Sequence, residues 1–134
     1  LLVNTSRQFV YTSALPDHIC VAAATAVPLA KKGNLQKRLL ENIRQFSARL
    51  KEQGFTLGNS SSQIIPVIVG DEKKTVSFSK ELLKNGVFAQ AVRYPTVKKG
   101  SARVRVSLTA MHKKTLIDVA VAAFDKAGRI AGVI

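Results

Sequence analysis

Residues 102–108 alternate between polar and apolar side chains, and this pattern constrains the fold more than any other stretch of the chain. The polar positions are Arg103, Arg105 and Ser107, and the apolar positions are Val104, Val106 and Leu108. Because successive side chains of a β-strand point to opposite faces, the alternation predicts a strand with one buried face and one exposed face. Such a strand points two guanidinium groups to the same side.

A second strand and a connecting loop precede this segment. Residues 87–92 are rich in β-forming side chains and follow an Asn-Gly pair, which commonly ends a helix. In the loop over 93–100, Pro95 fixes its own φ angle and keeps Tyr94 out of the helical region. The sequence therefore predicts strand, rigid loop and strand, with the hydroxyl of Thr96 carried on the loop.

The arginines of this segment have two interpretations. A guanidinium group offers a planar fork for a carboxylate and keeps its charge at neutral pH, so Arg103 and Arg105 could form an anion site. Alternatively, arginines on the wet face of an edge strand are simply solvated, since polar side chains normally face outward in an antiparallel sheet. Spacing alone favours the solvated alternative and does not decide between the two.

The rest of the chain supplies helices and one more strand. Expected helices span 16–29, 34–53, 72–85 and 113–127, and expected strands span 63–69, 87–92 and 102–108. The order is helix, helix, strand, helix, strand, strand, helix. It predicts an α/β fold of the two-layer α+β type, in which a small mixed or antiparallel sheet carries helices on one face.

Several single residues refine this prediction. Pro66 cannot donate a ladder hydrogen bond, so its strand is expected at an edge or with a bulge. Asp71 follows that strand as a turn former or helix cap. Gly128 is expected to end the last helix, and the low-charge helix over 16–29 is expected to be packed on several sides. The apolar positions expected to face inward are Val76, Leu82 and Leu83 in one helix, and Ile117, Ala120, Val121 and Phe124 in the last.

The composition bounds the function. The 134 residues include 21 Lys+Arg against 8 Asp+Glu, a formal net charge of +13. A basic domain permits nucleic-acid binding, but the basic residues are spread out and aromatic residues do not interleave with them as a stacking platform requires. No apolar run approaches the ~20 residues of a membrane span. Cys20 is the single cysteine, no metal-ligand cluster surrounds it, and the cytoplasm is the expected location.

The central segment resembles the C-terminal signature of the α-oxoamine synthases. These pyridoxal 5'-phosphate enzymes condense an amino acid with an acyl thioester and release carbon dioxide. The shared pattern is R-x-P-T-V-x-x-G-x-A-R-x-R-x-x-L-x-A-x-H, carried here from Arg93 to His112. Where the family commonly has proline after Thr-Val, this chain has Lys98. Residues 64–71 are similar to the family's I-I-P-V-x-x-G-D element, and a β-rich run at 7–12 begins a segment similar to F-x-[FY]-[ST]-[ST]-A-L-P.

The resemblance implies roles for five residues. Thr12 and Ser13 match the positions that reach the cofactor phosphate of the neighbouring subunit in the homodimers of this family. Arg105 matches the position that holds the amino-acid carboxylate, Thr96 matches a substrate-contacting position, and Arg93 is a candidate for orienting the acyl chain. From the residues alone, Thr12 and Ser13 could instead cap the helix that follows Pro16.

The resemblance also indicates what the sequence lacks. In the family, the lysine that forms the Schiff base lies upstream of the segment matching Phe9 to Pro16, in a glycine-flanked motif that does not occur here. The sequence is therefore interpreted as the C-terminal part of an enzyme, with no catalytic residue of its own and no activity alone. Residues 1–33 would be the end of a large domain with an interdomain helix, and residues 34–134 the small C-terminal domain.

Three functions follow as alternatives. The first is a synthase that uses alanine and an acyl thioester of coenzyme A or a carrier protein. The second is another synthase of the same family with a different amino acid or thioester. The third is a basic binding module without catalysis, which predicts salt-dependent binding to DNA or RNA. The enzyme interpretation expects substrates and a second copy of the chain as partners, and neither nucleic acid nor membrane.

Overall fold

The computed structural model describes residues 1–134, except for the side chain of Leu2. The chain divides into two compact units, residues 1–33 and residues 34–134. The assignment of the first unit to the end of a larger domain stays a prediction.

The first unit is helical. It contains α1 (Leu2–Thr5), α2 (Arg7–Val10) and α3 (Asp17–Lys31). The run at 7–12, although rich in β-forming residues, is largely helical, because the amides of Val10 and Tyr11 bond back to the carbonyls of Ser6 and Arg7 at 2.9 and 3.0 Å. The described residues of this unit contain no strand with which this run could pair. Its backbone groups instead form local hydrogen bonds that close a helical turn.

Helix α3 is longer and more exposed than the sequence predicts. It continues past Leu29 to Lys31 with Pro28 inside it, and all its residues are exposed. The expectation that it is packed on several sides is not met in this unit, since α1 and α2 leave its Ala- and Val-rich surface uncovered.

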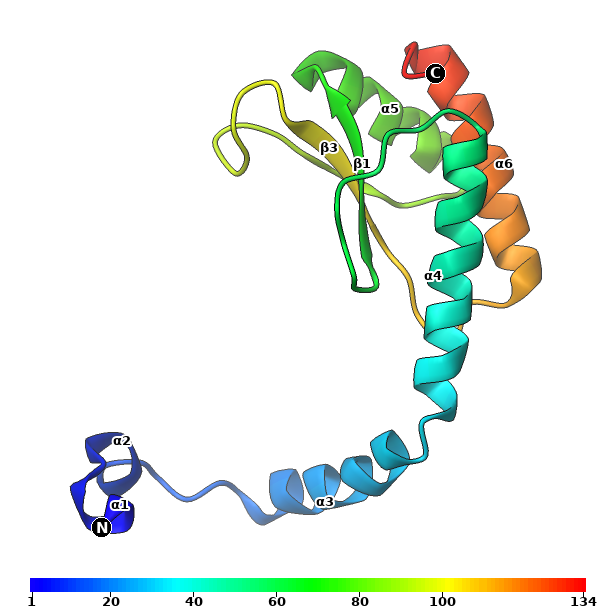
Figure 1. The fold of residues 1–134 in the computed structure, drawn as a ribbon. Coiled ribbons are helices and arrows are strands. Elements are labelled where there is room, and N and C mark those ends of the chain that lie inside the picture. Colours follow the sequence, from blue (N-terminus) through cyan, green and yellow to red (C-terminus); the bar gives the residue numbers. More distant parts are fainter. The chain divides into compact units, whose positions relative to one another are not determined.

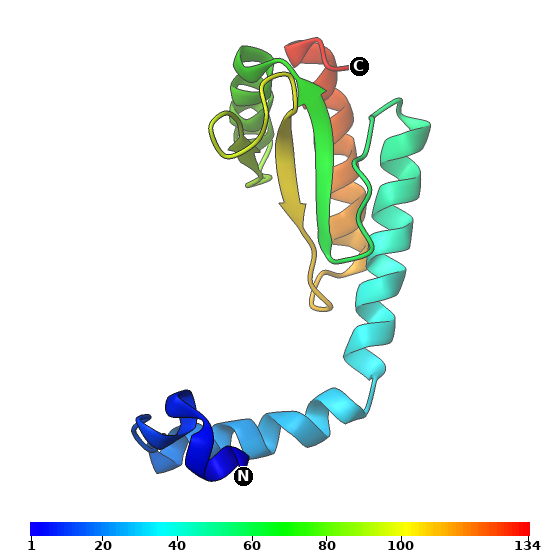
Figure 2. The same cartoon turned by 60° about the vertical axis from the view of Figure 1, so that its left-hand side comes forward.

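The second unit is a two-layer α/β structure, as predicted (Figure 1). Its elements are α4 (Asn34–Glu52), β1 (Ile64–Gly70), α5 (Glu72–Lys84), β2 (Gln90–Val92), β3 (Ala102–Ser107) and α6 (Lys114–Ala131). The sheet has the order β1-β3-β2 with both pairs antiparallel, so β3 is central. Helix α5 packs against all three strands, and α6 packs against α5 and α4. Figure 2 shows these helices on one side of the sheet.

Alternation in β3 has the predicted effect on burial. Val104 and Val106 are buried, while Arg105 and Ser107 are exposed. Strand β2, however, is shorter than the predicted strand over 87–92. The amide of Val87 bonds to the carbonyl of Leu82 at 2.9 Å, and the hydroxyl of Ser79 donates to the carbonyl of Ala89 at 2.6 Å. These residues are held by α5 before the chain pairs with β3.

Pro66 lies in an edge strand, which confirms the prediction. Its carbonyl accepts a hydrogen bond from the amide of Gly58 at 2.8 Å, and the amide of Ile68 donates to Thr56 at 2.8 Å. The segment before β1 therefore covers part of this edge. The irregularity in the ladder falls between Ile68 and Gly70 and not at Pro66.

Four phenylalanines form the centre of the core. The ring of Phe124 meets those of Phe46, Phe55 and Phe78 edge-on, with centroids 5.5, 5.9 and 5.6 Å apart. Phe55 and Phe78 stack at 5.7 Å. Edge-to-face pairs of this kind add to the energy of apolar burial. The cluster joins α4, α5, α6 and the turn after α4 into one layer.

Two predictions about the helices need correction. Leu83 is 59% exposed, and the inward positions of α5 are Thr75, Phe78 and Leu82. Gly128 does not end α6, which runs on to Ala131 and is capped by Gly132 at a φ of 64°. Gly128 is a packing position instead, because a Cβ there would lie 2.6 Å from Cζ of Phe55.

Other expected positions are confirmed. Asp71 is the N-cap of α5, and its Oδ1 accepts a hydrogen bond from the amide of Lys74 at 2.7 Å. On α6, Ile117, Val121 and Phe124 are buried.

Candidate functional site

The outer face of the sheet carries Arg105, whose guanidinium is oriented by the neighbouring strand. Gln90 stands directly opposite it in the β2–β3 register. Nη2 of Arg105 donates to Oε1 of Gln90 at 2.7 Å. One edge of the guanidinium is therefore held by the amide, and the exposed side chain keeps further N–H groups for a ligand.

Arg103 lies two residues earlier on the same face. It is half-buried, and its Nε donates to the carbonyl of Ser101 at 3.0 Å. Because β3 is the central strand, the alternative that placed these arginines on an edge strand is wrong. Both arginines are set between two strands, which limits the directions in which their side chains extend.

A groove on this face brings the two arginines together. Its lining residues are Asn59, Ser60, Ser62, Ile64, Pro66, Val92, Arg103 and Arg105. The hydroxyl of Ser60 donates to the carbonyl of Ile64 at 2.6 Å and lies 3.2 Å from the hydroxyl of Ser62. The groove thus has two cations on the sheet and a wall of hydroxyl and amide groups.

The two arginines have no acidic partner among the described side chains. The ion pairs found there join Arg49 to Asp118, Lys84 to Glu81, and Arg129 to Asp125. The guanidiniums of the groove are therefore not neutralised by a carboxylate of the described side chains. The carboxylate-site interpretation therefore stays a prediction, with two guanidiniums and several polar groups lining one hollow.

The loop between β2 and β3 places Thr96 next to Arg103. Thr96 is exposed, and its amide donates to the carbonyl of Arg93 at 2.9 Å. The loop forms a hollow lined by Tyr94, Pro95, Thr96, Val97, Lys98, Ser101 and Arg103. The ammonium group of Lys99 lies 5.3 Å from the ring centroid of Tyr94. Arg103 is therefore shared between this hollow and the groove that contains Arg105.

Arg93 lies apart from the other two candidates. It lines a separate hollow with Glu72, Lys73 and Val76 at the start of α5. The structure thus brings Thr96, Arg103 and Arg105 together along adjoining hollows and leaves Arg93 outside them.

Thr12 and Ser13 belong to the first unit, in the link between α2 and α3. Both are exposed, and the hydroxyl of Thr12 approaches the carbonyl of Ser13 at 3.5 Å. The N-cap of α3 is Pro16, with no side-chain hydrogen bond. The alternative that these hydroxyls cap the helix is therefore wrong, and both remain available to a ligand.

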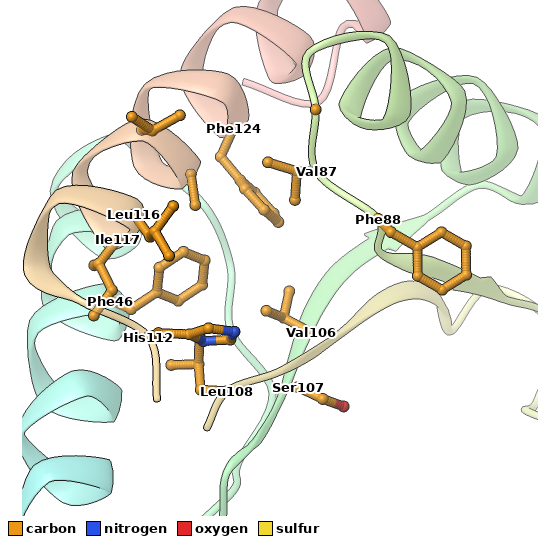
Figure 3. Close-up of a pocket in the computed structure, with 13 residues that line it drawn as sticks. Phe46, Val87, Phe88, Val106, Ser107, Leu108, His112, Leu116, Ile117 and Phe124 are labelled. Carbon is orange, nitrogen blue, oxygen red and sulfur yellow. The ribbon is translucent and has the colours of Figure 1, made fainter. Parts of the chain in front are cut away.

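An apolar cavity of about 280 Å³ lies on the opposite face of the sheet, between β3 and α6 (Figure 3). Its lining includes Phe46, Val106, Leu108 and Phe124, with the imidazole of His112 beside them. The amide of Thr109 donates to Nδ1 of His112 at 3.3 Å. His112, the last residue of the signature, therefore stabilises the turn after β3.

Sequence reasoning missed several residues that shape these sites. Gln90, Ser60 and Ser62 contact or face the arginines only because distant segments meet at the outer face. Asn42 was also missed. It is buried, and its amide donates to the carbonyls of Thr109 and His112, both at 3.0 Å. The register of the β2–β3 pair is the signal that would have identified Gln90.

Comparison with known proteins identifies the family. The family described as aminotransferase class I and II matches residues 1–124, and the chain belongs to it. The 8-amino-7-oxononanoate synthase of Symbiobacterium thermophilum is 44% identical over 100% of this chain and 34% of its own length. The same enzyme of Thermoanaerobacter pseudethanolicus is 40% identical over 99% of the chain and 34% of its own length. The chain thus spans about a third of these curated relatives.

Solved structures show the same fold. The serine palmitoyltransferase of Sphingomonas wittichii has a TM-score of 0.88 at 32% identity, over 99% of this chain and 34% of that one. The serine palmitoyltransferase of S. paucimobilis, solved with PLP and myriocin bound, has a TM-score of 0.83 at 30% identity, over 96% and 33% of the two chains. In the part of this chain that the structure describes, no helix has both the length and the apolar character needed to cross a bilayer.

Proposed function

We propose that this chain is the C-terminal part of a pyridoxal phosphate-dependent α-oxoamine synthase of the 8-amino-7-oxononanoate synthase type. The complete enzyme would condense L-alanine with a pimeloyl thioester of coenzyme A or a carrier protein, with loss of carbon dioxide, in biotin biosynthesis. The observation that carries the proposal is the pair of arginines without acidic partners on the outer face of β3, within the signature segment. The 44% identical relative of that name supports the specific reaction.

The residues of this chain suit a phosphate-bearing cofactor. Thr12 and Ser13 offer two exposed hydroxyls, and neither is used as a helix cap. In the proposal they bind the cofactor phosphate of the neighbouring subunit in a homodimer, because hydroxyl groups donate well to phosphate oxygens. When bound, the cofactor supplies an electron sink for the carbanion formed at the amino-acid α-carbon. No lysine of this chain is assigned to hold it covalently.

Arg105 would hold the amino-acid carboxylate. Its guanidinium can form two parallel hydrogen bonds to a carboxylate, and the bond to Gln90 fixes its orientation beforehand. Arg103 adds positive charge in the same groove, and Thr96 can donate from the adjoining hollow. Arg93 is assigned to the acyl chain or its terminal carboxylate, which agrees with its separate position near α5.

The first experiment is the Arg105→Ala substitution in the complete enzyme. Removing a charge-assisted contact should cost about 2–3 kcal/mol in kcat/KM for alanine, a loss of roughly 30- to 150-fold. The matched control is Arg38→Ala, which removes an exposed arginine of α4 far along the sequence from the groove. If Arg105→Ala leaves kcat/KM for alanine unchanged while the protein stays folded, Arg105 does not hold the carboxylate.

A second candidate is a synthase of the same family that uses another amino acid, such as the glycine C-acetyltransferase or 5-aminolevulinate synthase type. The solved relatives that are serine palmitoyltransferases at 30–32% identity make serine a further candidate. Turnover of the complete enzyme with alanine, glycine and serine at a fixed thioester separates these functions. The proposal expects the highest kcat/KM with alanine.

A further inference from the structure

A second groove lies between α4 and the segment that leads into β1. This segment runs alongside α4 before the chain turns into β1, as Figure 2 shows. The groove is lined by Ile43, Arg44, Ser47, Ala48, Lys51, Leu57, Gly58, Asn59, Ser60 and Ile65. All of these residues belong to the second unit, so the groove is complete within it.

One wall of the groove carries positive charge. Arg44, Ser47 and Lys51 are spaced by three and four residues and therefore lie on one side of α4. Seven residues of helix separate the backbone positions of Arg44 and Lys51 by about 10 Å along the axis. Both are exposed, and the ion pairs of the described side chains involve neither of them. Two free cations at this separation suit a ligand that carries more than one anionic group.

The rest of the lining has different chemistry. The apolar part of the lining is Ile43, Ala48, Leu57 and Ile65, of which Ile65 is buried, while Asn59 presents an amide from the facing segment. A ligand that fits these surfaces combines anionic groups with an apolar or flat moiety, since exposed cations and apolar side chains line the same groove.

The facing segment is held in place before any ligand binds. The amide of Gly58 donates to Pro66 at 2.8 Å, and the amide of Ser62 donates to the hydroxyl of Ser60 at 3.2 Å. Gly58 is also packed closely, because a Cβ there would lie 2.8 Å from Cγ of Pro66. The wall is therefore preformed, which reduces the ordering cost of binding.

This wall is shared with the arginine groove. Asn59 and Ser60 line both hollows, one on each side of the segment. A ligand that begins in the groove beside α4 can therefore extend past this wall toward Arg103 and Arg105. Long substrates with a reactive end and a charged end have this form.

We propose that the α4 groove binds the phosphate-bearing nucleotide end of an acyl thioester. This inference rests on the proposed function, in which the thioester reacts near the arginine groove. Coenzyme A supplies several phosphate charges and an adenine ring, whereas the pantetheine arm of a carrier protein supplies one phosphate only. The two separated cations and the apolar part of the lining favour coenzyme A as the source of the phosphate groups.

The test uses the complete enzyme with the double variant Arg44→Gln/Lys51→Gln. Its control is Lys37→Gln/Arg38→Gln, which removes the same charge from the exposed first turn of α4 outside the groove. The substrates are one acyl group on coenzyme A, on phosphopantetheine and on pantetheine. Because exposed ion pairs each contribute modestly, the groove variant should raise KM for the coenzyme A thioester by about five- to tenfold.

The same variant should leave kcat, KM for alanine and KM for the pantetheine thioester unchanged, and the control should alter none of them. An equal rise with the phosphopantetheine thioester would overturn the nucleotide assignment and give the groove to the pantetheine phosphate. Equal KM values for groove variant and wild type would overturn the inference altogether.

A direct binding measurement separates failure of this inference from failure of the proposed function. Coenzyme A itself is titrated calorimetrically into the complete protein, without any turnover. Weaker binding to the groove variant than to the control supports the groove even if no amino acid is turned over. Equal binding to both variants overturns it even if the synthase reaction is established.

Discussion

The two faces of strand β3 differ in what surrounds them. On one face Val104 is completely buried and contacts the aromatic layer formed by the helices. On the other face, one residue further along, Arg105 is exposed and its guanidinium donates to Gln90. The difference shows that one strand can carry stabilising residues on one face and candidate binding residues on the other. Burial of the apolar face stabilises the fold, whereas the charged face contributes little to the free energy of unfolding.

The separation can be tested by substitutions on each side of the sheet. Changes in the helical layer should lower the free energy of unfolding, whereas changes on the outer face should alter substrate use without altering stability.

The largest effect is expected for Phe124→Ala in the helical layer. Phe124 is fully buried and meets three other phenylalanine rings. Truncation of a buried phenylalanine costs about 3–5 kcal/mol through lost burial and the cavity left behind. Denaturant unfolding of variant and wild type measures this loss. Phe88→Ala is the control, since Phe88 is 84% exposed and should change stability by less than ~0.5 kcal/mol.

Gly128→Ala tests the helical layer in a different way. Alanine favours a helix over glycine by about 1 kcal/mol, so the substitution would be stabilising in an exposed helix. At Gly128 the new Cβ would lie 2.6 Å from Cζ of Phe55, and overpacking should destabilise by about 1–3 kcal/mol. A shift of the unfolding midpoint to higher denaturant would contradict the packing role. The reference is Ala122→Gly at an exposed position of α6, which should cost about 1 kcal/mol through propensity alone.

A smaller effect, and one confined to function, is expected for Gln90→Ala. Its loss frees the guanidinium of Arg105, to which it bonds at 2.7 Å. A hydrogen bond of this kind contributes about 0.5–1.5 kcal/mol, so in the complete enzyme of the proposed function KM for the amino acid should rise by roughly two- to tenfold. The unfolding midpoint and KM for the thioester should not change. A drop in stability with unchanged KM would make Gln90 a structural residue and not a positioning residue.

The smallest effect concerns an ion pair on α6 between the exposed Arg129 and the half-buried Asp125. The hydrogen bond and charge of Arg129 lower the pKa of Asp125 below its usual value of roughly 3.9. A lowered pKa in the folded state adds stability at neutral pH, and that stability is lost as pH falls through the folded pKa. Asp125→Asn should therefore be slightly less stable than wild type at pH 7 and equal to it in acid. A gap that does not shrink as pH falls through the folded pKa of Asp125 would exclude ionisation as its cause.

The candidate site was predictable where its chemistry is local. Alternation in residues 102–108 is enough to assign Arg105 and Val104 to opposite faces of one strand. Thr96 was found because its proline-containing loop is a local feature as well. Gln90, Ser60 and Arg44 could not be assigned in this way, since each matters through a segment far from it in sequence.

The fold shows the same division. Periodicity predicted the helices and strands of residues 34–134, because side-chain direction follows from backbone geometry within a few residues. It failed at Gly128 and Leu83. Gly128 looked like a helix end because glycine often stands there, but Phe55 packs against it. Leu83 was predicted to be buried because it is apolar, but on α5 the neighbouring Leu82 is the buried residue and Leu83 is exposed.

The sequence by itself determined the order of the elements in residues 34–134, the two faces of β3 and the family to which the chain is similar, since these depend on neighbouring residues and on motifs. Tertiary structure alone decided that β3 is central, that Gln90 holds Arg105, and that one wall separates two cationic grooves. The physical reason is that strand order and register follow from the packing of residues distant in sequence, which no local pattern records.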